Sequence, residues 1–313
     1  MCASVAPGNL VLGIGDDAAA WRPSRSNLSV ITTDALIEDV HFTQTGMSAR
    51  EVGHRALAAN LSDIAAMGAR PVLATIALGL GAHPNLAWIY EFYEGLTTLA
   101  QRYGCAIAGG DITRSPTITI AITVTGEVRA SNMKRRSGAR AGDIVALSGP
   151  LGASRAGLGI VRDHPEFLTH DEYAPLVAHF RTPEPRLHEG AWFAASRNVH
   201  ALMDSSDGLA TDLARMCAAS SCGARVDTVA VAPLARAYAL ALGEDPESYA
   251  LSGGEDFELI AAIDARAFRY LAGRYRQRFG RELIAVGAFT EGSGVRFANG
   301  AAIASSGWDH LRG

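Results

Sequence analysis

Five short turns rich in glycine, serine or threonine place aspartates directly beside apolar stretches of this chain. The turns are G-I-G-D-D (13–17), T-T-D (32–34), N-L-S-D (60–63), G-G-D (109–111) and D-S-S-D-G (204–208). Isolated acids usually become solvated surface charges, whereas acids repeated in this setting predict a convergent site with several carboxylates. Such a site suits hard divalent cations, and Mg²⁺ held by carboxylates most often accompanies phosphate chemistry.

The composition describes an ordinary globular protein and excludes several classes of function. The 313 residues suggest two domains at roughly 150 residues each, and the hydrophobic content of 48% provides ample core. A net charge of −4 offers no basic surface for nucleic acid. No apolar run approaches the roughly 20 residues that cross a bilayer, and the N-terminus lacks the regions of a signal peptide. The four cysteines show no metal-ligand spacing, so we interpret them as reduced thiols of a cytoplasmic protein.

Lys134 is the only lysine of the chain, and this limits how the protein could handle ATP. A P-loop requires G-x-x-x-x-G-K-[ST], and a protein kinase requires a strand lysine in a V-A-I-K-like context. Lys134 lies in N-M-K-R-R and fits neither pattern. An ATP-dependent activity would therefore need another source of positive charge.

Strand and helix patterns in both halves predict two α/β or α+β domains. In the first half we expect strands at 10–17, 28–34, 72–80, 105–111 and 117–128, and helices at 48–67 and 85–103. The stretch 129–142 shifts to basic and small polar residues, which makes it the best domain boundary. Beyond it we expect strands at 143–148, 199–204, 225–229, 256–263, 283–289 and 294–298, and helices at 152–162, 171–197, 209–220 and 265–279.

Local signals support the two helices of the first half. Ser48 and Glu51 form an S-x-x-E capping box at the start of the first helix. Asn85 is the expected N-cap of the second helix, and Gly104 is its expected stop.

Each acidic turn has a structural and a functional interpretation. Asp34 and Asp111 are expected to end apolar strands, where ligand sites are common, although an acid that merely terminates a strand has the same pattern. Asp63 lies inside a helix among apolar residues, where an unpaired buried acid is costly, so we expect a metal ligand or a salt bridge to an arginine. In the 204–208 turn the helix N-terminus would bind phosphate, or Asp207 would cap the following helix; the two are compatible.

Three further residues could contribute to a site. Glu255, in S-G-G-E-D-F-E-L, is expected to be exposed at the start of a strand, unless it only completes a tight loop. Arg136 could bind phosphate oxygens bidentately or be a solvated charge at a hinge. His41 could be catalytic or structural.

The joint order of these motifs resembles the thiamine-monophosphate kinase family, which is part of the aminoimidazole-ribonucleotide-synthetase-related superfamily. The most specific motifs are N-L-S-D-I-A-A-M-G-A (60–69), G-G-D-I-T-R (109–114), S-D-G-L (206–209) and S-G-G-E-D-F-E-L (252–259). The resemblance extends from about residue 10 to residue 311. It departs from the family at the N-terminus, because members usually have a helix ahead of the G-I-G-D-D turn.

The resemblance implies an ATP-dependent transfer of the γ-phosphoryl group to thiamine monophosphate, which is the last step of thiamine diphosphate biosynthesis. It implies an N-terminal domain (1–135) that binds ATP and metal and dimerises through its mixed sheet into a barrel-like interface. It also implies a C-terminal α/β sandwich (136–313) that completes the nucleotide and substrate site. We therefore expect a cytoplasmic homodimer whose partners are ATP and thiamine monophosphate, with no nucleic acid or membrane partner.

The resemblance also implies roles for individual residues. The expected ligands to several Mg²⁺ ions are Asp17, Thr32, Thr33, Asp34, Asp63, Asp111, Asp204 and Asp207. The expected ATP contacts are Tyr93, Gly110, Asp111, Arg136 and Ser206, and the expected substrate contacts are His41, Glu255 and Trp308. No residue is assigned as a general base, because a phosphate monoester with a second pKa of about 6 is already largely a dianion at neutral pH.

Two other classes of function are weighed against this expectation. A superfamily relative, such as an ATP-dependent cyclo-ligase or a selenophosphate synthetase, would turn over ATP without thiamine monophosphate. The latter needs a reactive cysteine in a glycine-rich setting, which Cys2 lacks. A non-catalytic maturation factor or nucleotide-binding scaffold would bind without turnover, but it would be expected to lose the acids that this chain retains.

Overall fold

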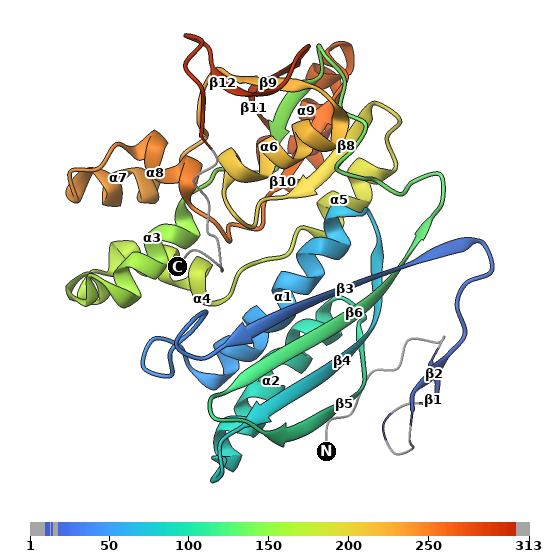
Figure 1. Cartoon of the computed structure of the whole chain (residues 1–313), viewed down its shortest axis with the longest axis vertical. Helices are drawn as coiled ribbons and strands as arrows, with labels where there is room; N and C mark the ends of the chain where they lie inside the picture. Colours follow the sequence, from blue (N-terminus) through green and yellow to red (C-terminus); the bar gives the residue numbers. More distant parts are fainter. Residues whose placement is uncertain (1–9, 13, 15–17, 305–313) are drawn as a thin grey trace. The chain divides into compact units, whose positions relative to one another are not determined.

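The computed structural model describes residues 10–12, 14 and 18–304, and these divide into two compact units. The first unit holds the chain up to Met133 except for residues 66–68, and the second holds residues 66–68 and the chain from Lys134 onwards. Each unit combines helices with strands (Figure 1). The predicted two-domain α/β (α+β) class is confirmed, and the barrel-like dimer interface stays a prediction.

A four-stranded sheet forms the centre of the first unit, with the strand order β3, β6, β4, β5. Its strands are β3 (Asn27–Ile37), β6 (Thr119–Arg129), β4 (Arg70–Leu80) and β5 (Ala106–Arg114). β6 pairs antiparallel with β3 and β4, and β5 runs parallel to β4. Two short strands, β1 (Leu10–Leu12) and β2 (Ala20–Trp21), form a separate sheet.

Two helices, α1 (Ala49–Ala66) and α2 (Leu86–Arg102), accompany the sheet of the first unit (Figure 1). Their starts follow the predicted signals, which are confirmed. The backbone N–H of Ser48 donates to Glu51 Oε2 at 2.7 Å, and the Ser48 hydroxyl accepts from the Glu51 N–H at 3.3 Å. Asn85 Oδ1 accepts from the Ala87 N–H at 3.0 Å. These bonds satisfy amides that a helix leaves unpaired at its N-terminus.

Glycines let α1 and α2 approach each other closely. A Cβ atom on Gly53 of α1 would lie 2.0 Å from the carbonyl oxygen of Phe92 in α2. On Gly95 of α2 it would lie 1.9 Å from the carbonyl oxygen of Arg50 in α1. Neither position has room for a side chain, so the interaxial distance of this helix pair depends on both glycines.

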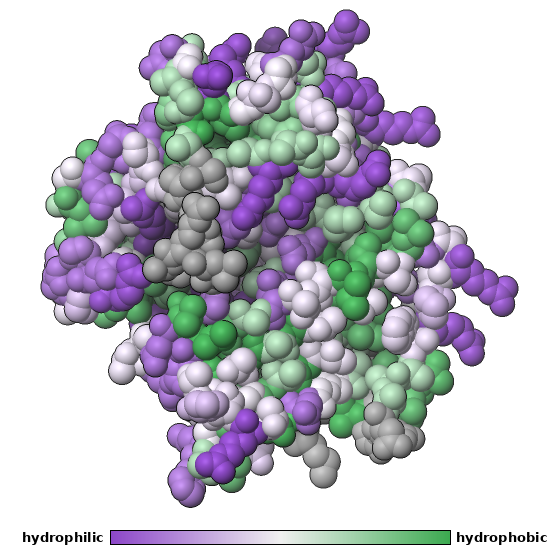
Figure 2. Space-filling model, in the orientation of Figure 1, coloured by the Kyte–Doolittle hydropathy of each residue, from purple (hydrophilic) through white to green (hydrophobic). Residues whose placement is uncertain are grey.

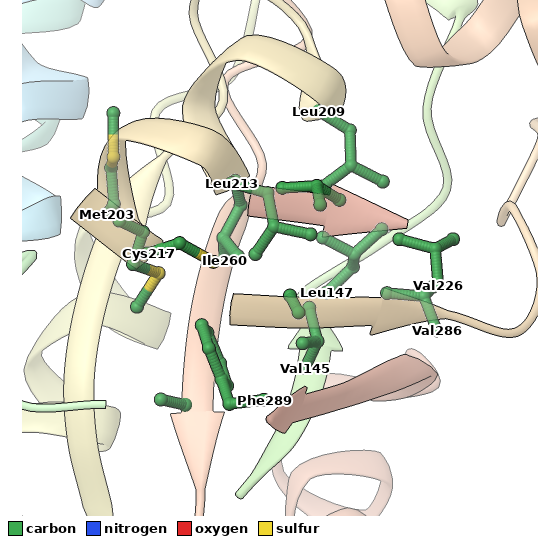
Figure 3. Packing of buried hydrophobic residues seen from close by; sticks show 14 of the residues in the cluster. Val145, Leu147, Met203, Leu209, Leu213, Cys217, Val226, Ile260, Val286 and Phe289 are labelled. Atoms are coloured by element: carbon green, nitrogen blue, oxygen red, sulfur yellow. The ribbon is translucent and has the colours of Figure 1, made fainter. Parts of the chain in front are cut away.

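The second unit is built on a six-stranded sheet with the order β12, β9, β11, β7, β10, β8. Its strands are β7 (Ile144–Leu147), β8 (Val199–Asp204), β9 (Gly223–Val226), β10 (Leu259–Ile263), β11 (Ile284–Thr290) and β12 (Gly294–Phe297). All neighbours pair antiparallel except β12 and β9. One face of the sheet packs on α6 (Leu209–Ser220) through the apolar cluster of Figure 3, which includes Leu147, Leu213, Ile260 and Phe289.

Further helices complete the second unit. They are α3 (Ala153–Arg162), α4 (Ala174–Arg181), α5 (Leu187–Ala194), α7 (Pro233–Ala241), α8 (Pro246–Ser252) and α9 (Ala265–Phe279), with the 3-10 helices η1 (Pro165–Thr169) and η2 (Asp171–Tyr173). A second cluster of buried residues, with Tyr173, Tyr238 and Tyr249 at its centre, joins α3, α4, α7 and α8. In the described part of the chain, no helix is long and apolar enough to cross a membrane.

The structure corrects several expected element boundaries. β3 continues to Ile37 and β5 continues to Arg114, because both strands pair with their neighbours beyond the expected ends. The helix expected at 171–197 is interrupted where Pro183 and Pro185 remove backbone donors, and α4 and α5 lie on either side of them. α7 and α8 were not predicted, and each begins with a proline at its first turn.

Lys134 has a structural role at the start of the second unit. Its Nζ donates to the carbonyl oxygens of Ser196 at 2.8 Å and Val199 at 2.6 Å. Burial lowers the pKa of Lys134 from its ordinary value. The single lysine therefore anchors the segment that follows the first unit onto the turn between α5 and β8.

Substituting Gly53 by alanine should separate α1 from α2. The new methyl group meets a backbone carbonyl that cannot rotate away, so we expect a loss of about 1–3 kcal/mol in the free energy of unfolding. Urea denaturation measures this loss. The matched control is Gly273→Ala in the middle of α9, where a Cβ meets no atom within 4 Å and where alanine favours the helix. Equal midpoints for the two variants would contradict the close-approach role of Gly53.

Candidate functional site

Three of the predicted metal ligands lie on one side of the first unit's sheet. The Thr32 hydroxyl of β3 donates a hydrogen bond to Asp63 Oδ2 of α1. Residues two apart on a strand share a face, so Asp34 lies on the same face of β3 as Thr32, and this face is turned toward α1. Asp34 and Asp63 are both half-buried. Thr32 therefore fixes the orientation of the Asp63 carboxylate beside the strand that carries Asp34.

Asn60 adds a polar atom on the same helix. It lies three residues before Asp63 on α1 and is completely buried. Its Nδ2 donates to the Ala56 carbonyl oxygen at 3.1 Å, whereas its Oδ1 accepts no hydrogen bond among the described residues. A buried acceptor without a donor is costly, so this position favours a bound cation, a water molecule or a ligand donor.

Thr33 lies on the opposite face of β3. Its hydroxyl donates to the Ile122 carbonyl oxygen at 3.0 Å and accepts from the Thr123 hydroxyl at 3.1 Å. The structure therefore joins Thr32 to Asp63 on the face of β3 that also carries Asp34, and it leaves the Thr33 hydroxyl bonded to β6 on the other face.

Gly110 and Asp111 lie within β5, not at its end, which corrects the expected strand boundary. Gly110 pairs with Ile76 of β4, and a Cβ atom at Gly110 would lie 2.0 Å from the Ile76 carbonyl oxygen. Asp111 pairs with Ala77, one row further along, and is exposed. Asp34 is likewise inside its strand, opposite Ile122 of β6.

His41 follows β3 in a tight turn and is half-buried. Its Nδ1 accepts the backbone N–H of Ile37 at 3.1 Å. A ring nitrogen that accepts carries no proton, so the neutral imidazole has its proton on Nε2. Tyr93 lies on α2, half-buried, with its ring edge-to-face against Phe92 at 5.2 Å between centroids.

In the second unit, Asp204 ends β8 as predicted and is buried. The following turn is organised by Asp212 of α6, which the sequence analysis did not assign to the site. Asp212 Oδ2 accepts the backbone N–H groups of Ser206 and Asp207, each at 3.0 Å. Asp207 is not the helix cap, because the N-cap position is Gly208 and it makes no side-chain capping bond. These two amides are therefore engaged by the chain's own carboxylate and do not form an open phosphate site.

Arg215 neutralises the acids of this turn. Its Nη1 contacts Asp207 Oδ2, and it lies 3.2 Å from Asp212 Oδ1. Burial raises the pKa of Asp212 to about 6, and the adjacent negative charge of Asp207 acts in the same direction. Asp207 is half-buried.

Arg136 lies in an exposed loop whose backbone is held by Ser220 at the end of α6. The Ser220 hydroxyl donates to the Arg136 carbonyl oxygen at 3.1 Å and accepts from the N–H groups of Gly138 and Ala139, both at 3.2 Å. The loop is thus fixed while the guanidinium is directed to solvent.

Glu255 is joined to the Ser206 turn by its backbone. Its N–H donates to the Ser206 carbonyl oxygen at 2.8 Å, so the structure brings these two predicted site residues together. Glu255 is half-buried and precedes β10, which begins at Leu259, so it is not the exposed first residue of a strand. Its φ of 63° lies in the left-handed region, which is uncommon for a residue with a side chain.

Glu258 is a buried acid of the same motif that sequence reasoning missed. It is 1% exposed and accepts from Arg186 Nη2 at 2.7 Å, from Arg281 and from the Ser148 hydroxyl. Burial opposes its ionisation, but Arg186 and Arg281 hold its pKa below the ordinary value. The signal in the sequence is an acid at an apolar position of S-G-G-E-D-F-E-L; its partners lie too far along the chain to be inferred.

Two predicted residues, Asp17 and Trp308, lie outside the described residues. Among the residues that the structure does describe, no three His, Cys, Asp or Glu side chains are grouped to hold a metal ion. Asp34, Asp63 and Asp111 belong to the first unit, and Asp204 and Asp207 belong to the second. The assignment of these acids as Mg²⁺ ligands stays a prediction.

The raised pKa of Asp212 gives a pH dependence of stability. Its ordinary value is 3.8, so the folded protein binds this proton more tightly than the unfolded chain does. The resulting stabilisation is full below pH 3.8 and is lost as the pH rises through about 6. We expect the unfolding free energy of the wild type to decrease, relative to that of Asp212→Asn, as the pH rises from 3.8 to about 6. Urea titration at several pH values measures both proteins. Parallel profiles for the two proteins would contradict this assignment.

The chain is similar over most of its length to a family of known proteins. Residues 15–128 match the family AIR synthase related protein, N-terminal domain, and residues 140–297 match AIR synthase related protein, C-terminal domain. The thiamine-monophosphate kinase of Synechococcus elongatus is 38% identical over 220 residues, which cover 69% of this chain and 67% of that protein.

Solved structures agree with the sequence comparisons. The thiamine-monophosphate kinase from Stenotrophomonas maltophilia K279a has a TM-score of 0.86 and 34% identity, covering 94% of this chain and 92% of that one. AaThiL complexed with AMPPCP and TMP has a TM-score of 0.80 and 29% identity, covering 95% and 91%. The chain therefore belongs to the thiamine-monophosphate kinase family of AIR synthase related proteins.

Proposed function

We propose that this protein transfers the γ-phosphoryl group of ATP to thiamine monophosphate and releases thiamine diphosphate and ADP. The observation that carries the proposal is the similarity to AaThiL, which extends over 95% of this chain and was solved with AMPPCP and TMP bound. In this proposal residues 1–135 bind ATP and metal, and residues 136–313 complete the nucleotide and substrate site. The protein acts in the cytoplasm.

The donor atoms fit Mg²⁺. Thr32, Asp34 and Asp63 present oxygens on one side of the first unit's sheet, and the buried Asn60 Oδ1 lies on the same helix as Asp63. Mg²⁺ needs only one or two carboxylates, because it keeps several waters and binds substrate phosphates directly. The absence of a three-acid cluster among the described residues is compatible with this mode. Bound Mg²⁺ would supply the positive charge that offsets the anionic phosphates.

The proposed Mg²⁺ ligands are those predicted from the sequence except Thr33, whose hydroxyl is engaged on the other face of β3: Asp17, Thr32, Asp34, Asp63, Asp111, Asp204 and Asp207. Within this set Thr32 orients the carboxylate of Asp63, and Arg215 balances the charge of Asp207. The acceptor phosphate is already a dianion, so no side chain has to remove a proton from it. The chain's task is to hold two anions in line for a direct transfer without a phosphoenzyme.

The remaining residues contact the ligands. Arg136 binds phosphate oxygens from its fixed loop, and Tyr93, Gly110, Asp111 and Ser206 contact ATP. For thiamine monophosphate, His41 donates from Nε2, and Glu255 faces the cationic or amino part of the molecule. Trp308 stacks on a ring of the substrate.

Homodimerisation through the first unit's sheet is part of the proposal. Figure 2 shows green and pale residues over the strands of this sheet, and Ile31 of β3 is 74% exposed. β3 is also an edge strand of eleven residues in the described sheet, and a long open edge is a template for pairing with another chain. A second copy that covers this face and pairs with this edge would remove both liabilities.

Product analysis with three acceptors tests the proposed activity. The protein is incubated with Mg-ATP and either thiamine monophosphate, thiamine or no acceptor, and ADP and thiamine diphosphate are separated by chromatography. We expect thiamine diphosphate, with equal ADP, only from thiamine monophosphate. ADP without thiamine diphosphate would favour a cyclo-ligase-like relative, and binding without turnover would favour a scaffold.

Asp63→Asn should remove most of the activity without unfolding the protein. Asparagine keeps the size of the side chain but loses the charge that a cation requires, so we expect kcat to fall by about 10²–10³. The matched control is Asp264→Asn, at the N-cap of α9, where the side chain accepts the Arg266 N–H at 2.9 Å. Steady-state kinetics measures both variants, and thermal unfolding checks that both are folded. Wild-type kcat in folded Asp63→Asn would contradict the metal role.

Ile31→Asp should convert a dimer into a monomer. An exposed position tolerates the charge in a monomer, whereas a dimer would bury it or place it opposite its copy. Sedimentation velocity should show half the wild-type mass for this variant. Tyr270→Asp in α9, 65% exposed in the second unit, should keep the wild-type mass. A monomeric wild type at micromolar concentration would contradict the proposed interface.

A further inference from the structure

Asp256 is the most deeply buried acid of the S-G-G-E-D-F-E-L turn, and the proposed chemistry does not use it. Its exposure is 0%, and its carboxylate lies at the N-terminus of α3. Oδ2 accepts the Gly152 N–H at 2.6 Å, and Oδ1 accepts the Ser154 N–H at 2.9 Å. These are amides that the helix itself leaves unpaired, and a negative charge at this end is favourable.

The turn that Asp256 holds has an unusual backbone. Glu255 and Phe257, its two neighbours, have φ values of 63° and 51°. Residues with side chains enter this region only when the surrounding structure compensates for the strain. Asp256 lies between the two strained positions, and the hydrogen bonds from the Gly152 and Ser154 N–H groups fix it there.

The same turn is bonded to the turn that carries Ser206. The Glu255 N–H donates to the Ser206 carbonyl oxygen at 2.8 Å, and the Phe257 N–H donates to the Ser205 carbonyl oxygen at 3.0 Å. The Ser205 N–H donates to the Glu258 carbonyl oxygen at 2.7 Å. The two segments thus continue the hydrogen bonding of β8 with β10 past the ends of these strands.

Close packing reinforces this pairing. A Cβ atom on Gly254 would lie 2.5 Å from the Ser206 carbonyl oxygen. A Cβ atom on Gly208 would lie 3.0 Å from the Leu251 carbonyl oxygen, and Gly208 also has a φ of 99°. The backbones of the two turns are therefore in close contact at these glycines, where no side chain separates them.

We propose that Asp256 is a positioning residue that sets Ser206 and Glu255 as one rigid unit, so that the nucleotide contact and the substrate contact are placed together. The roles of Ser206 and Glu255 in this inference rest on the proposed function. Asp256 touches neither ligand and acts through the amides of α3 and the backbone of residues 253–257. Its loss should weaken the binding of both ligands, although the two contacts are on separate segments of the chain.

Two variants of different chemistry test the inference. Asp256→Asn keeps the side-chain volume but replaces one acceptor oxygen with an amide donor, which opposes one of the two helix N–H groups. Gly254→Ala leaves Asp256 intact and inserts a methyl group against the Ser206 carbonyl oxygen. Their matched controls are Asp264→Asn, which alters a carboxylate at the N-terminus of α9, and Gly273→Ala, where the methyl group meets no atom.

The first readout is kinetic. A misplacement of about 1 Å can cost about 10²-fold, so we expect both test variants to raise KM for ATP and for thiamine monophosphate by about tenfold or more. A smaller effect on kcat is expected, because the proposed metal ligands remain. Controls should stay within about twofold of the wild type. A folded Asp256→Asn variant that raises KM for only one ligand, or for neither, would overturn the proposal.

The second readout does not depend on activity. Hydrogen exchange, followed by mass spectrometry, reports peptides that cover residues 204–208 and 252–258. The amides of both peptides should exchange at least about tenfold faster in Asp256→Asn and in Gly254→Ala, while those of β10 stay protected. Unchanged exchange in both peptides would overturn the positioning role even in an active enzyme. If the wild type made no thiamine diphosphate, the proposed function would fail, and exchange would still decide whether Asp256 couples the two turns. Should Asp256→Asn not fold, Gly254→Ala decides by the same two readouts whether the two turns act as one unit, and unchanged KM and exchange in this variant would overturn the proposal.

Discussion

Hydrogen bonds from backbone N–H groups to a buried carboxylate hold two turns of the second unit, at residues 204–208 and 252–258. Asp212 holds the amides of Ser206 and Asp207, and Asp256 holds those of Gly152 and Ser154. Each of these acids loses hydration on burial, and the amides return hydrogen bonds that offset part of that cost. Such a contact has a defined direction and length, so it fixes a loop more sharply than apolar packing would.

Seven acids of this chain illustrate two roles that differ with burial. Asp212, Asp256 and Glu258 have no exposed surface or almost none, and they hold backbone amides or arginines within the second unit. Asp34, Asp63, Asp207 and Glu255 are half-buried and lie where ligands have been proposed. The first group holds the turns of the second unit, and two members of the second group, Asp207 and Glu255, lie on those turns. In the first unit Glu127 is a comparable anchor, because it accepts the Ser24 N–H at 3.1 Å and Arg70 Nη2 at 2.9 Å.

Local sequence patterns were sufficient for the elements whose causes are local. The capping box at Ser48, the cap at Asn85 and the helix that follows Gly208 all depend on residues within one turn of each other. Strand ends were predicted less well, because β3 and β5 continue for as long as a neighbouring strand offers hydrogen bonds. That partner is distant in sequence, so no local signal marks where the pairing stops.

The candidate site shows the same limit more strongly. The aspartates and glycines could be predicted from their turns, and Thr32 and Asp63 do meet. The roles of Asp212 and Asp256 could not be predicted. Asp212 accepts hydrogen bonds from the turn before its helix, and Asp256 accepts them from a helix 102 to 104 residues away in the sequence. Neither acid has a sequence context that distinguishes it from a solvated surface acid. Asp207 illustrates the converse: its position suggested a helix cap, whereas the structure pairs it with Arg215.

The single lysine limits the sources of positive charge for the proposed reaction. The one lysine is engaged by two carbonyl oxygens, so positive charge near the predicted ligands comes from arginines and, in the proposed reaction, from metal ions. The most direct test follows the label from [γ-³²P]ATP during one turnover with thiamine monophosphate. We expect label in thiamine diphosphate when the acceptor is present, and no label on the protein with or without it. Labelled protein formed from ATP alone, or label released only as inorganic phosphate, would contradict it.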